Sequence, residues 1–419
     1  MTDLATRAAP PRAPSPRRAA PALLGYAAVR ALGLVVLAVW SDARGGSAYT
    51  LLTARWDALW YTRVASGGYG YEVRTAGGDV HSDLAFFPLL PWLERLLHAL
   101  TPWSYADAGF VVALLASLAA AWGIFAVADH VYGGRAGVCA VLLWAVLPVG
   151  IVQSMAYSES LFTALAAWSL YAVLTGRWIT AGALAACAGL TRPVGLAVVA
   201  AVWAAGLAPF VGDRRTRAGG GARLGGHAPG AVGSARARRV PAGDGAYGEP
   251  RAPSPWRRAL GAALAPLGVA SYVLWVGRHT GRGPFGYLDV QAGWRNGFDG
   301  GYAFARFVAG RFTSFPSALA GVGLIAGVAL VIWLYVTCVR RRQPLALLVY
   351  SGVVVALALG ASSYFGSKPR LLLPAFPLLL PLAVALARSR TSRAALVTGG
   401  VALASAVYGA FWLNGSGPP

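Results

Sequence analysis

The chain is dominated by a succession of apolar runs, many of them long enough to cross a lipid bilayer. A hydrocarbon core of about 30 Å needs about 20 apolar residues in a helix. Only 12% of the 419 residues are charged, about half the share that a soluble domain carries. The chain is therefore predicted to be an all-α polytopic membrane protein. The runs cover residues 22–40, 108–128, 136–152, 159–174, 178–211, 258–277, 315–338, 345–362, 371–387 and 394–413.

The run 178–211 is too long for one span. At about 1.5 Å per residue it would form a helix of about 50 Å. Its middle reads "LTRPVG", where Pro193 disfavours helical geometry at Arg192 and removes a backbone donor. Two shorter helices are therefore predicted in this run, which brings the total to about eleven crossings.

The distribution of arginine predicts the orientation. The formal net charge is +21, and the basic clusters lie in an N-terminal tail (1–21), in 212–257, at 340–342 and at 388–393. Each cluster flanks an apolar run, which is typical of cytoplasmic loops rather than of a nucleic-acid surface. We expect the tail and the Arg/Gly-rich loop 212–257 to be disordered and cytoplasmic.

The same count of crossings predicts which segments lie on the extracytoplasmic side of the membrane. A broken 178–211 run keeps every basic cluster inside and places the short tail 414–419 outside. The run 22–40 is long enough to span and no convincing small-residue cleavage site follows it, so we expect it to stay attached rather than act as a signal peptide. The predicted membrane regions are 22–211 and 258–413.

Four segments then face the extracytoplasmic side, and they hold most of the distinctive polar and aromatic residues. They are a long first loop 41–107, a short loop 153–158, a loop 278–314 and the segment 363–370. Within the first loop, leucines at helical spacing over 81–100 predict an amphipathic helix on the membrane surface. A functional site is expected where these segments converge.

The stretch "ARWDALWYTRVA" in the first loop contains a carboxylate among aromatic rings. Asp57 and Tyr61 are four residues apart and share one face of a short helix. A structural interpretation makes Asp57 a first-turn acid favoured by the helix dipole, with the tryptophans as interfacial anchors. A functional interpretation makes Asp57 a general base. The residues alone leave both open.

Other charged residues have the same two interpretations. Glu159 can cap a helix or bind a ligand, and Arg192 in the broken run is a costly charge near membrane depth. Lys368 and Arg370 are cations on the outer side, which a phosphate would compensate. His81 can contact a headgroup or phosphate, or simply precede the surface helix.

Several kinds of site are not indicated. There is no Gly-rich phosphate loop, no paired Cys/His motif and no nucleophile elbow. The three cysteines are scattered through apolar runs and are interpreted as packing residues. No cofactor and no metal site are expected, although dependence on a divalent metal stays open.

Six motifs occur in an order that resembles the PIG-V type mannosyltransferases, relatives of the enzyme that adds the second mannose to glycosylphosphatidylinositol anchors. The motifs are "RWDALWY", "AFFPLLP", "YSESLF", "GLTRPVG", "PFGYLDVQAGW" and "RLLLPAFPLLLP". The resemblance covers residues 22–390. It implies a GT-C glycosyltransferase fold and a donor of the polyprenyl-phosphate-mannose class.

The resemblance also implies roles for residues of this chain. Asp57 matches the catalytic acid of the first outer loop, where it would deprotonate the acceptor hydroxyl. The donor phosphate would be held by Arg192, Lys368, Arg370 and His81. The sugar or acceptor would be bound by Trp56, Tyr61, Glu159, Gln291 and Trp294. The acceptor would be a glycan, a lipid or a protein outside the cytoplasm.

Two other classes of function remain as alternatives. A polytopic transporter or lipid flippase would show paired halves with broken helices in corresponding positions. The one break near Arg192 has no obvious twin. A catalytically silent scaffold would show no dependence on Asp57.

Overall fold

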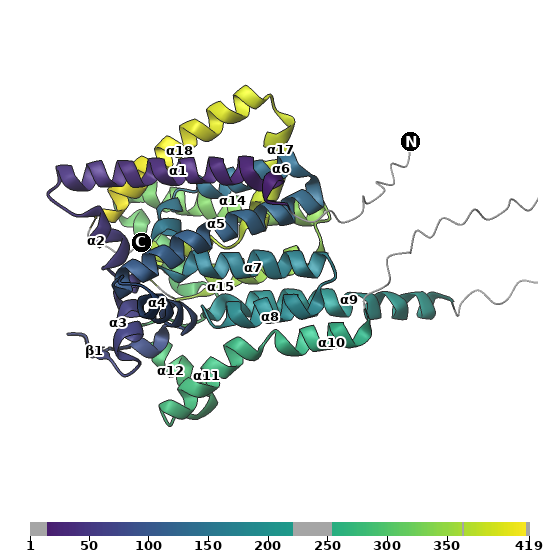
Figure 1. The fold of residues 1–419 in the computed structure, drawn as a ribbon, viewed down its shortest axis with the longest axis horizontal. Coiled ribbons are helices and arrows are strands. Elements are labelled where there is room, and N and C mark those ends of the chain that lie inside the picture. Colours follow the sequence, from purple (N-terminus) through teal and green to yellow (C-terminus); the bar gives the residue numbers. More distant parts are fainter. Residues whose placement is uncertain (1–14, 221–253, 363, 416–419) are drawn as a thin grey trace, which may run out of the picture.

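Long helices aligned side by side form the body of the molecule (Figure 1). The structure is a computed structural model, and it describes residues 15–220, 254–362 and 364–415. The predicted all-α class is confirmed, with one two-stranded ribbon as the only sheet among the described residues. The long helices are α1 (Pro16–Ala43), α5 (Tyr105–Tyr132), α14 (Ser317–Arg340) and α18 (Thr391–Leu413).

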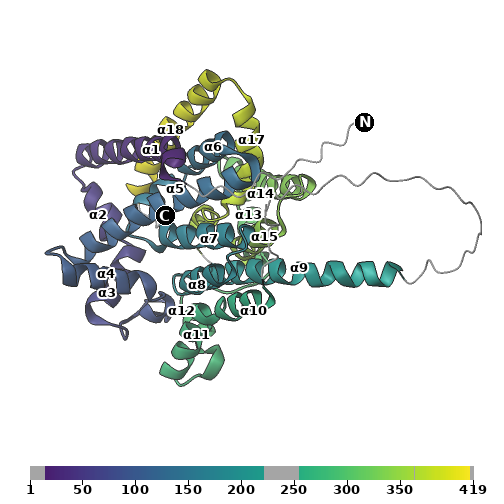
Figure 2. The ribbon, with the colours of Figure 1, turned by 45° about the vertical axis from the view of Figure 1, so that its right-hand side comes forward.

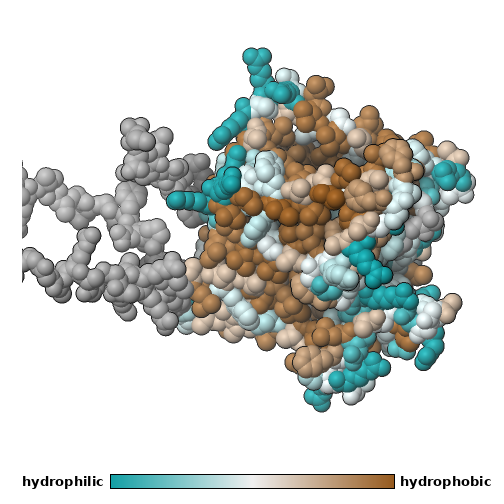
Figure 3. Space-filling view, turned by 180° about the vertical axis from the view of Figure 1, so that it is seen from behind, coloured by the Kyte–Doolittle hydropathy of each residue, from teal (hydrophilic) through white to brown (hydrophobic). Residues whose placement is uncertain are grey.

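Five helices of the described chain are long and apolar enough to cross a membrane. The fifth is the pair α10 (Pro255–Leu264) and α11 (Leu267–His279), which counts as one helix from Pro255 to His279. A sixth candidate is bent by 72° between Phe365–Leu371 and Phe376–Arg388. The chain is thus a multi-pass membrane protein, and apolar side chains cover the middle of the face in Figure 3.

Shorter apolar helices occupy the remaining predicted spans. They are α6 (Gly134–Ala145), α7 (Ser158–Leu174), α8 (Trp178–Gly189), the start of α9 (Leu196–Gly220) and α15 (Leu345–Gly360). Each predicted span therefore contains helix, but these shorter helices fall below the length of a full crossing, so eleven crossings remain a prediction. The predicted break in 178–211 is present: α8 ends at Gly189 and a short 3₁₀ turn, Pro193–Gly195, precedes α9.

Shorter elements gather at one end of the bundle (Figure 1). The first loop forms α2, α3, a hairpin of β1 and β2, and α4, while the 278–314 loop contributes α12 and α13. In the hairpin Val73 pairs with His81. The bounds are α2 (Ala48–Thr53), α3 (Asp57–Gly67), β1 (Glu72–Arg74), β2 (Val80–Ser82), α4 (Leu89–Leu100), α12 (Gly286–Gly293), α13 (Tyr302–Ala309), α16 (Lys368–Leu371) and α17 (Leu380–Arg388), with 3₁₀ turns at Asp83–Ala85, Gly150–Ser154, Gly283–Phe285, Gly310–Thr313, Phe365–Ser367 and Phe376–Leu379.

The basic segments meet at the opposite end. Arg18 at the start of α1 pairs with Asp129 near the end of α5 at 3.0 Å. Arg135 at the start of α6 donates to the Ser389 carbonyl after α17 at 2.6 Å. The end of α9 extends beyond the bundle on this side (Figure 2). Three of the predicted cytoplasmic segments are thus on one end, away from α3 and α4.

Two predicted boundaries differ from the structure. α1 begins at Pro16, inside the predicted tail, because proline is well suited to the first helical turn. α9 continues to Gly220, inside the predicted loop 212–257. The rest of the predicted tail (1–14), most of the loop (221–253) and the end of the C-terminal tail (416–419) lie outside the described residues.

The helix α4 packs against α3 and α5. Its buried residues are Leu90, Pro91 and the charged Glu94, so the buried face is not formed by leucines alone. Arg95 donates to the carbonyls of Ala65 and Val64 at the end of α3. Glu94 is completely buried, its carboxylate has no hydrogen-bond partner, and a Cβ on Gly109 of α5 would meet it at 2.6 Å. The apolar side chains of Trp92, Leu96 and Leu100 remain exposed on the other side, as on a helix that lies at a membrane surface.

The buried Glu94 predicts a pH dependence of stability. Burial raises the pKa of Glu94 well above its usual range, so the folded protein holds this proton more tightly than the unfolded chain does. The free energy of unfolding should fall as pH rises from about 4.3 through the raised folded pKa. Glu94→Gln should therefore stabilise the protein more at higher pH, as measured by thermal unfolding in detergent.

The exposed Glu72 provides the control for that measurement. Glu72→Gln should follow the wild-type pH curve. A Glu94→Gln curve parallel to wild type would contradict the prediction.

Close helix packing depends on glycine between α8 and the α10–α11 pair. A Cβ at Gly268 would overlap the carbonyl oxygen of Ala186, and one at Gly182 would overlap that of Gly261. Backbone atoms cannot move aside as side-chain ends do. These helices therefore approach more closely than any residue with a Cβ allows.

Gly268→Ala should lower the thermal unfolding midpoint in detergent, because overpacking a close contact costs about 1–3 kcal/mol. Gly327→Ala is the matched control, because a Cβ there meets nothing within 4 Å. It should be neutral or stabilising, since alanine favours the helix over glycine. Equal midpoints for the two variants would refute the close approach.

Candidate active site

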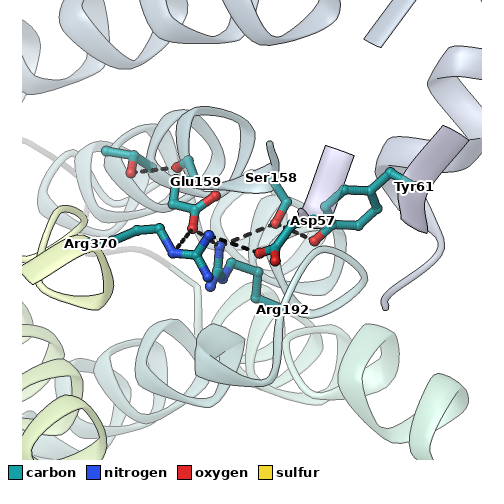
Figure 4. Close-up of polar contacts among 7 residues, drawn as sticks. Asp57, Tyr61, Ser158, Glu159, Arg192 and Arg370 are labelled. Carbon is teal, nitrogen blue, oxygen red and sulfur yellow. Dashed lines mark hydrogen bonds and ion pairs between the residues drawn. The ribbon is translucent and has the colours of Figure 1, made fainter. Parts of the chain in front are cut away.

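Four charged side chains from distant parts of the sequence form one cluster (Figure 4). Arg370 Nη1 lies 2.9 Å from Asp57 Oδ2, and Arg370 Nε lies 3.2 Å from Glu159 Oε1. Arg192 Nη1 lies 2.5 Å from the same Glu159 oxygen. The four side chains come from the start of α3, the first turn of α7, the break that precedes α9, and the short helix α16. The cluster therefore contains four of the predicted site residues.

Asp57 is the first residue of α3, where a carboxylate is favoured by the helix dipole. The preceding Trp56 has φ 51° and ψ −126°, a backbone conformation that is strained for a residue with a side chain. Trp56 packs against the main hydrophobic core. The packed indole thus holds the strained turn that aims Asp57 into the cluster.

Glu159 and Arg192 are paired inside the protein. Glu159 is in the first turn of α7 and its side chain is only 1% exposed. Arg192 is extended, with φ −161° and ψ 153°, because Pro193 follows it. A buried charge is tolerated when an opposite charge compensates it. The predicted break in the helix is what delivers this guanidinium to Glu159.

Tyr61 and Ser158 extend the cluster on the α3 side. The Tyr61 hydroxyl lies 2.7 Å from Ser158 Oγ, which also accepts from Arg192 Nη1 at 3.3 Å. Burial raises the pKa of Tyr61, so its hydroxyl stays protonated at neutral pH. Tyr61 thus ties α3 to α7 beside Asp57 instead of standing open to a sugar.

Arg370 bridges both carboxylates, and its guanidinium lies 5.1 Å from the ring centre of Tyr157. The neighbouring cation has a different environment. Lys368 Nζ donates to the carbonyls of Ala358 and Ala361 at the end of α15, at 2.8 and 2.7 Å. The structure thus brings Arg370 and Arg192 together but not Lys368.

His81 is also apart from the arginines. Its ring stacks on Trp294 at 4.1 Å with an interplanar angle of 10°. Trp294 contacts Trp60 edge-on at 5.0 Å and donates from Nε1 to the Ser82 carbonyl. Gln291 Nε2 donates to the Tyr287 hydroxyl at 2.5 Å. Trp294 of the 278–314 loop therefore belongs to a second, aromatic group beside α3, while Gln291 bonds to Tyr287 of its own helix.

Tyr157 was not predicted as a site residue, although it lies within the "YSESLF" motif. Asp83 is buried and accepts from the backbone N–H groups of Gly70 and Tyr71 at 2.9–3.2 Å. From the sequence Asp83, like His81, can contact a headgroup or phosphate; in the structure its carboxylate holds the turn of the first loop. Burial raises the pKa of Asp83, and the two backbone donors oppose that shift.

The described residues contain no group of three or more His, Cys, Asp or Glu that could hold a metal ion. The three cysteines are free. At the cluster itself the side chains offer two carboxylates and two guanidinium groups.

Residues 83–217, less than half of the chain, match the family described as dolichyl-phosphate-mannose-protein mannosyltransferase. No curated protein matches the chain. The matched segment includes Glu159 and Arg192. The match supports a membrane glycosyltransferase of the GT-C type.

Among solved structures the chain is similar to ArnT from Cupriavidus metallidurans. The form bound to undecaprenyl phosphate is 15% identical with a TM-score of 0.49, over 90% of this chain and 63% of that one. The apo form is 17% identical with a TM-score of 0.47, over 88% and 60%. The chain thus spans less than two thirds of the length of these proteins.

The position of Lys368 can be tested by labelling, because it is the only lysine in the sequence. Its side chain is buried and its ammonium group donates to two carbonyls. An amine-reactive reagent should modify Lys368 far more slowly in the folded protein than in the unfolded chain, as followed by peptide mass spectrometry. Fast labelling of folded protein would instead place Lys368 in an open phosphate site.

Proposed function

We propose that the chain is an integral-membrane, inverting mannosyltransferase that takes its sugar from a polyprenyl-phosphate-mannose. The observation that carries the proposal is the ion-paired cluster of Asp57, Glu159, Arg192 and Arg370 at one end of an apolar helical bundle. It joins a partly exposed carboxylate to two cations, the groups that such a transfer needs. The PIG-V type resemblance and the family match over 83–217 support the same class.

The proposed step is a single displacement at the sugar C1. The acceptor oxygen attacks C1, the bond from C1 to the phosphate oxygen breaks, and that oxygen keeps the electron pair. Asp57 takes the proton of the acceptor hydroxyl as it attacks. A phosphate leaving group is a weak base that needs no proton, but it needs positive charge.

Arg192 and Arg370 are the proposed donors to that phosphate. Guanidinium groups bind phosphate oxygens in a forked geometry that a lysine cannot reproduce. Their convergence on Glu159 supports this role more strongly than the positions of Lys368 and His81 support theirs. The aromatic group around Trp294 is the proposed wall for the sugar or acceptor.

The proposed site is extracytoplasmic, with the N-terminus in the cytoplasm. Arginine-flanked ends of α1, α6 and α17 lie together at one end of the bundle, and α3, which begins with Asp57, lies at the other (Figure 1). An excess of arginine marks the cytoplasmic side of membrane proteins. The acceptor would then be a glycan, lipid or protein hydroxyl on the outer side.

Mannose is proposed on the resemblance and on the name of the matching family. The chain's own contribution to sugar choice would come from side chains that can hydrogen-bond ring hydroxyls, with Gln291 and Asn296 as candidates. Asn296 Nδ2 already donates to Gln291 Oε1 at 3.0 Å, which orients that amide.

The test is transfer of mannose from polyprenyl-phosphate-mannose by purified protein in detergent. Asp57→Asn should lower turnover by about 10²–10⁴-fold, the contribution of a general base. Asp129→Asn, the same change in an ion pair at the opposite end, should retain turnover. Near-normal turnover of folded Asp57→Asn protein would remove the general-base role, and no turnover with any lipid-linked sugar would favour the transporter or flippase alternative.

A further inference from the structure

The charges of the cluster are already balanced without a ligand. Among the described residues, the two guanidinium groups of Arg192 and Arg370 face the two carboxylates of Asp57 and Glu159. Glu159 lies between both arginines, while the only ion pair of Asp57 within the described residues is with Arg370 (Figure 4). A phosphate that binds here must therefore compete with a carboxylate for a guanidinium edge.

The two carboxylates differ in how readily they can be displaced. Glu159 is 1% exposed and pairs with two guanidinium groups. Asp57 is 25% exposed and pairs with one. Removing Glu159 would take away the ion-pair partner of the buried Arg192 and leave Arg370 with Asp57 alone, which is costly. Moving Asp57 toward water costs much less, provided another anion takes its place on Arg370.

We propose that Glu159 is a positioning residue that holds Arg192 and Arg370 as a pair, and that the phosphate of the lipid donor displaces Asp57 from Arg370. The inference rests on the proposed function and assigns the two acids separate roles. Glu159 stays in place through the reaction. Asp57 leaves its ion pair when the donor binds and is then free to accept the proton of the acceptor hydroxyl.

The exchange gives a reason for the proposed base, Asp57, to be ion-paired with Arg370 before the donor binds. In the ion pair Asp57 Oδ2 faces Arg370 Nη1 at 2.9 Å, so this oxygen is directed at the guanidinium and not at an acceptor hydroxyl. Replacing one anion by another keeps Arg370 compensated throughout. The base therefore becomes available only when a donor phosphate is present, so the acceptor is activated only in the complex.

The exchange requires only the partly exposed Asp57 side chain to turn away from Arg370. Trp56, immediately before Asp57, stays in its strained conformation (φ 51°) because it packs against the core, and strained backbone of this kind is typical of functional sites. The ring centre of Tyr157 lies 5.1 Å from the Arg370 guanidinium. The arginine is thus supported by packing when the Asp57 side chain turns away.

The test is the affinity of purified protein for farnesyl phosphate, a prenyl phosphate without a sugar. Asp57→Asn removes the competing carboxylate and should tighten binding about tenfold, within the usual range of coupling between two ligands. Asp129→Asn should bind like wild type. Unchanged or weaker binding by Asp57→Asn protein would overturn the exchange, whereas no farnesyl phosphate binding by wild type would count against the proposed function itself.

A double-mutant cycle separates exchange at Arg370 from general repulsion between two anions. In an Arg370→Gln background the tightening by Asp57→Asn should vanish if Asp57 competes for Arg370. Tightening that persists in this background would overturn the exchange.

Glu159→Gln is predicted to have the opposite effect to Asp57→Asn. It should weaken farnesyl phosphate binding, because the two arginines lose their common anchor. Inorganic phosphate serves as the headgroup-only probe and should show the same order of the variants. Tighter binding by folded Glu159→Gln protein would contradict its positioning role. If the Glu159→Gln protein fails to fold, the double-mutant cycle of Asp57→Asn and Arg370→Gln tests the exchange without it.

Discussion

The structure depends on one constraint: within hydrocarbon, every backbone N–H and C=O must find a partner inside the protein. Helices meet this requirement along most of the chain, and every predicted span contains helix. Where a helix breaks, the released groups and any charge near them must be compensated by other segments. The breaks are therefore where the distinctive side chains meet.

The break at Arg192 and the bend before α17 illustrate this. Pro193 ends the helical geometry at Arg192, and the arginine is compensated by Glu159 of α7. At the bend, Lys368 compensates the carbonyls that end α15, while Arg370 turns toward α3 and α7. One cation thus completes a helix end and the other completes an acid cluster, although only two residues separate them.

Arg30 also compensates carbonyls at a helix end, but it does not contact the cluster. It is buried in α1 and donates to the carbonyls of Ala145 and Gly150, where α6 ends and a 3₁₀ turn follows. A charged residue in a membrane helix is therefore not by itself a sign of catalysis. What distinguishes the Asp57 cluster is that one of its carboxylates is partly exposed.

Sequence patterns determined the helical class, the broken run at Pro193, the first loop with its surface helix, and Asp57, Glu159, Arg192 and Arg370 as residues of interest. Run length, proline and charge placement act locally and can be read from the chain. Which of these residues meet was decided by tertiary structure, because α3, α7, the break and α16 are far apart in sequence. Spacing could not tell that Lys368 would turn to α15 or His81 to Trp294, since each side chain takes the nearest group that compensates its charge or covers its ring. Nor could it tell that Glu94 would lie against Gly109, because only the packed helices remove that carboxylate from water.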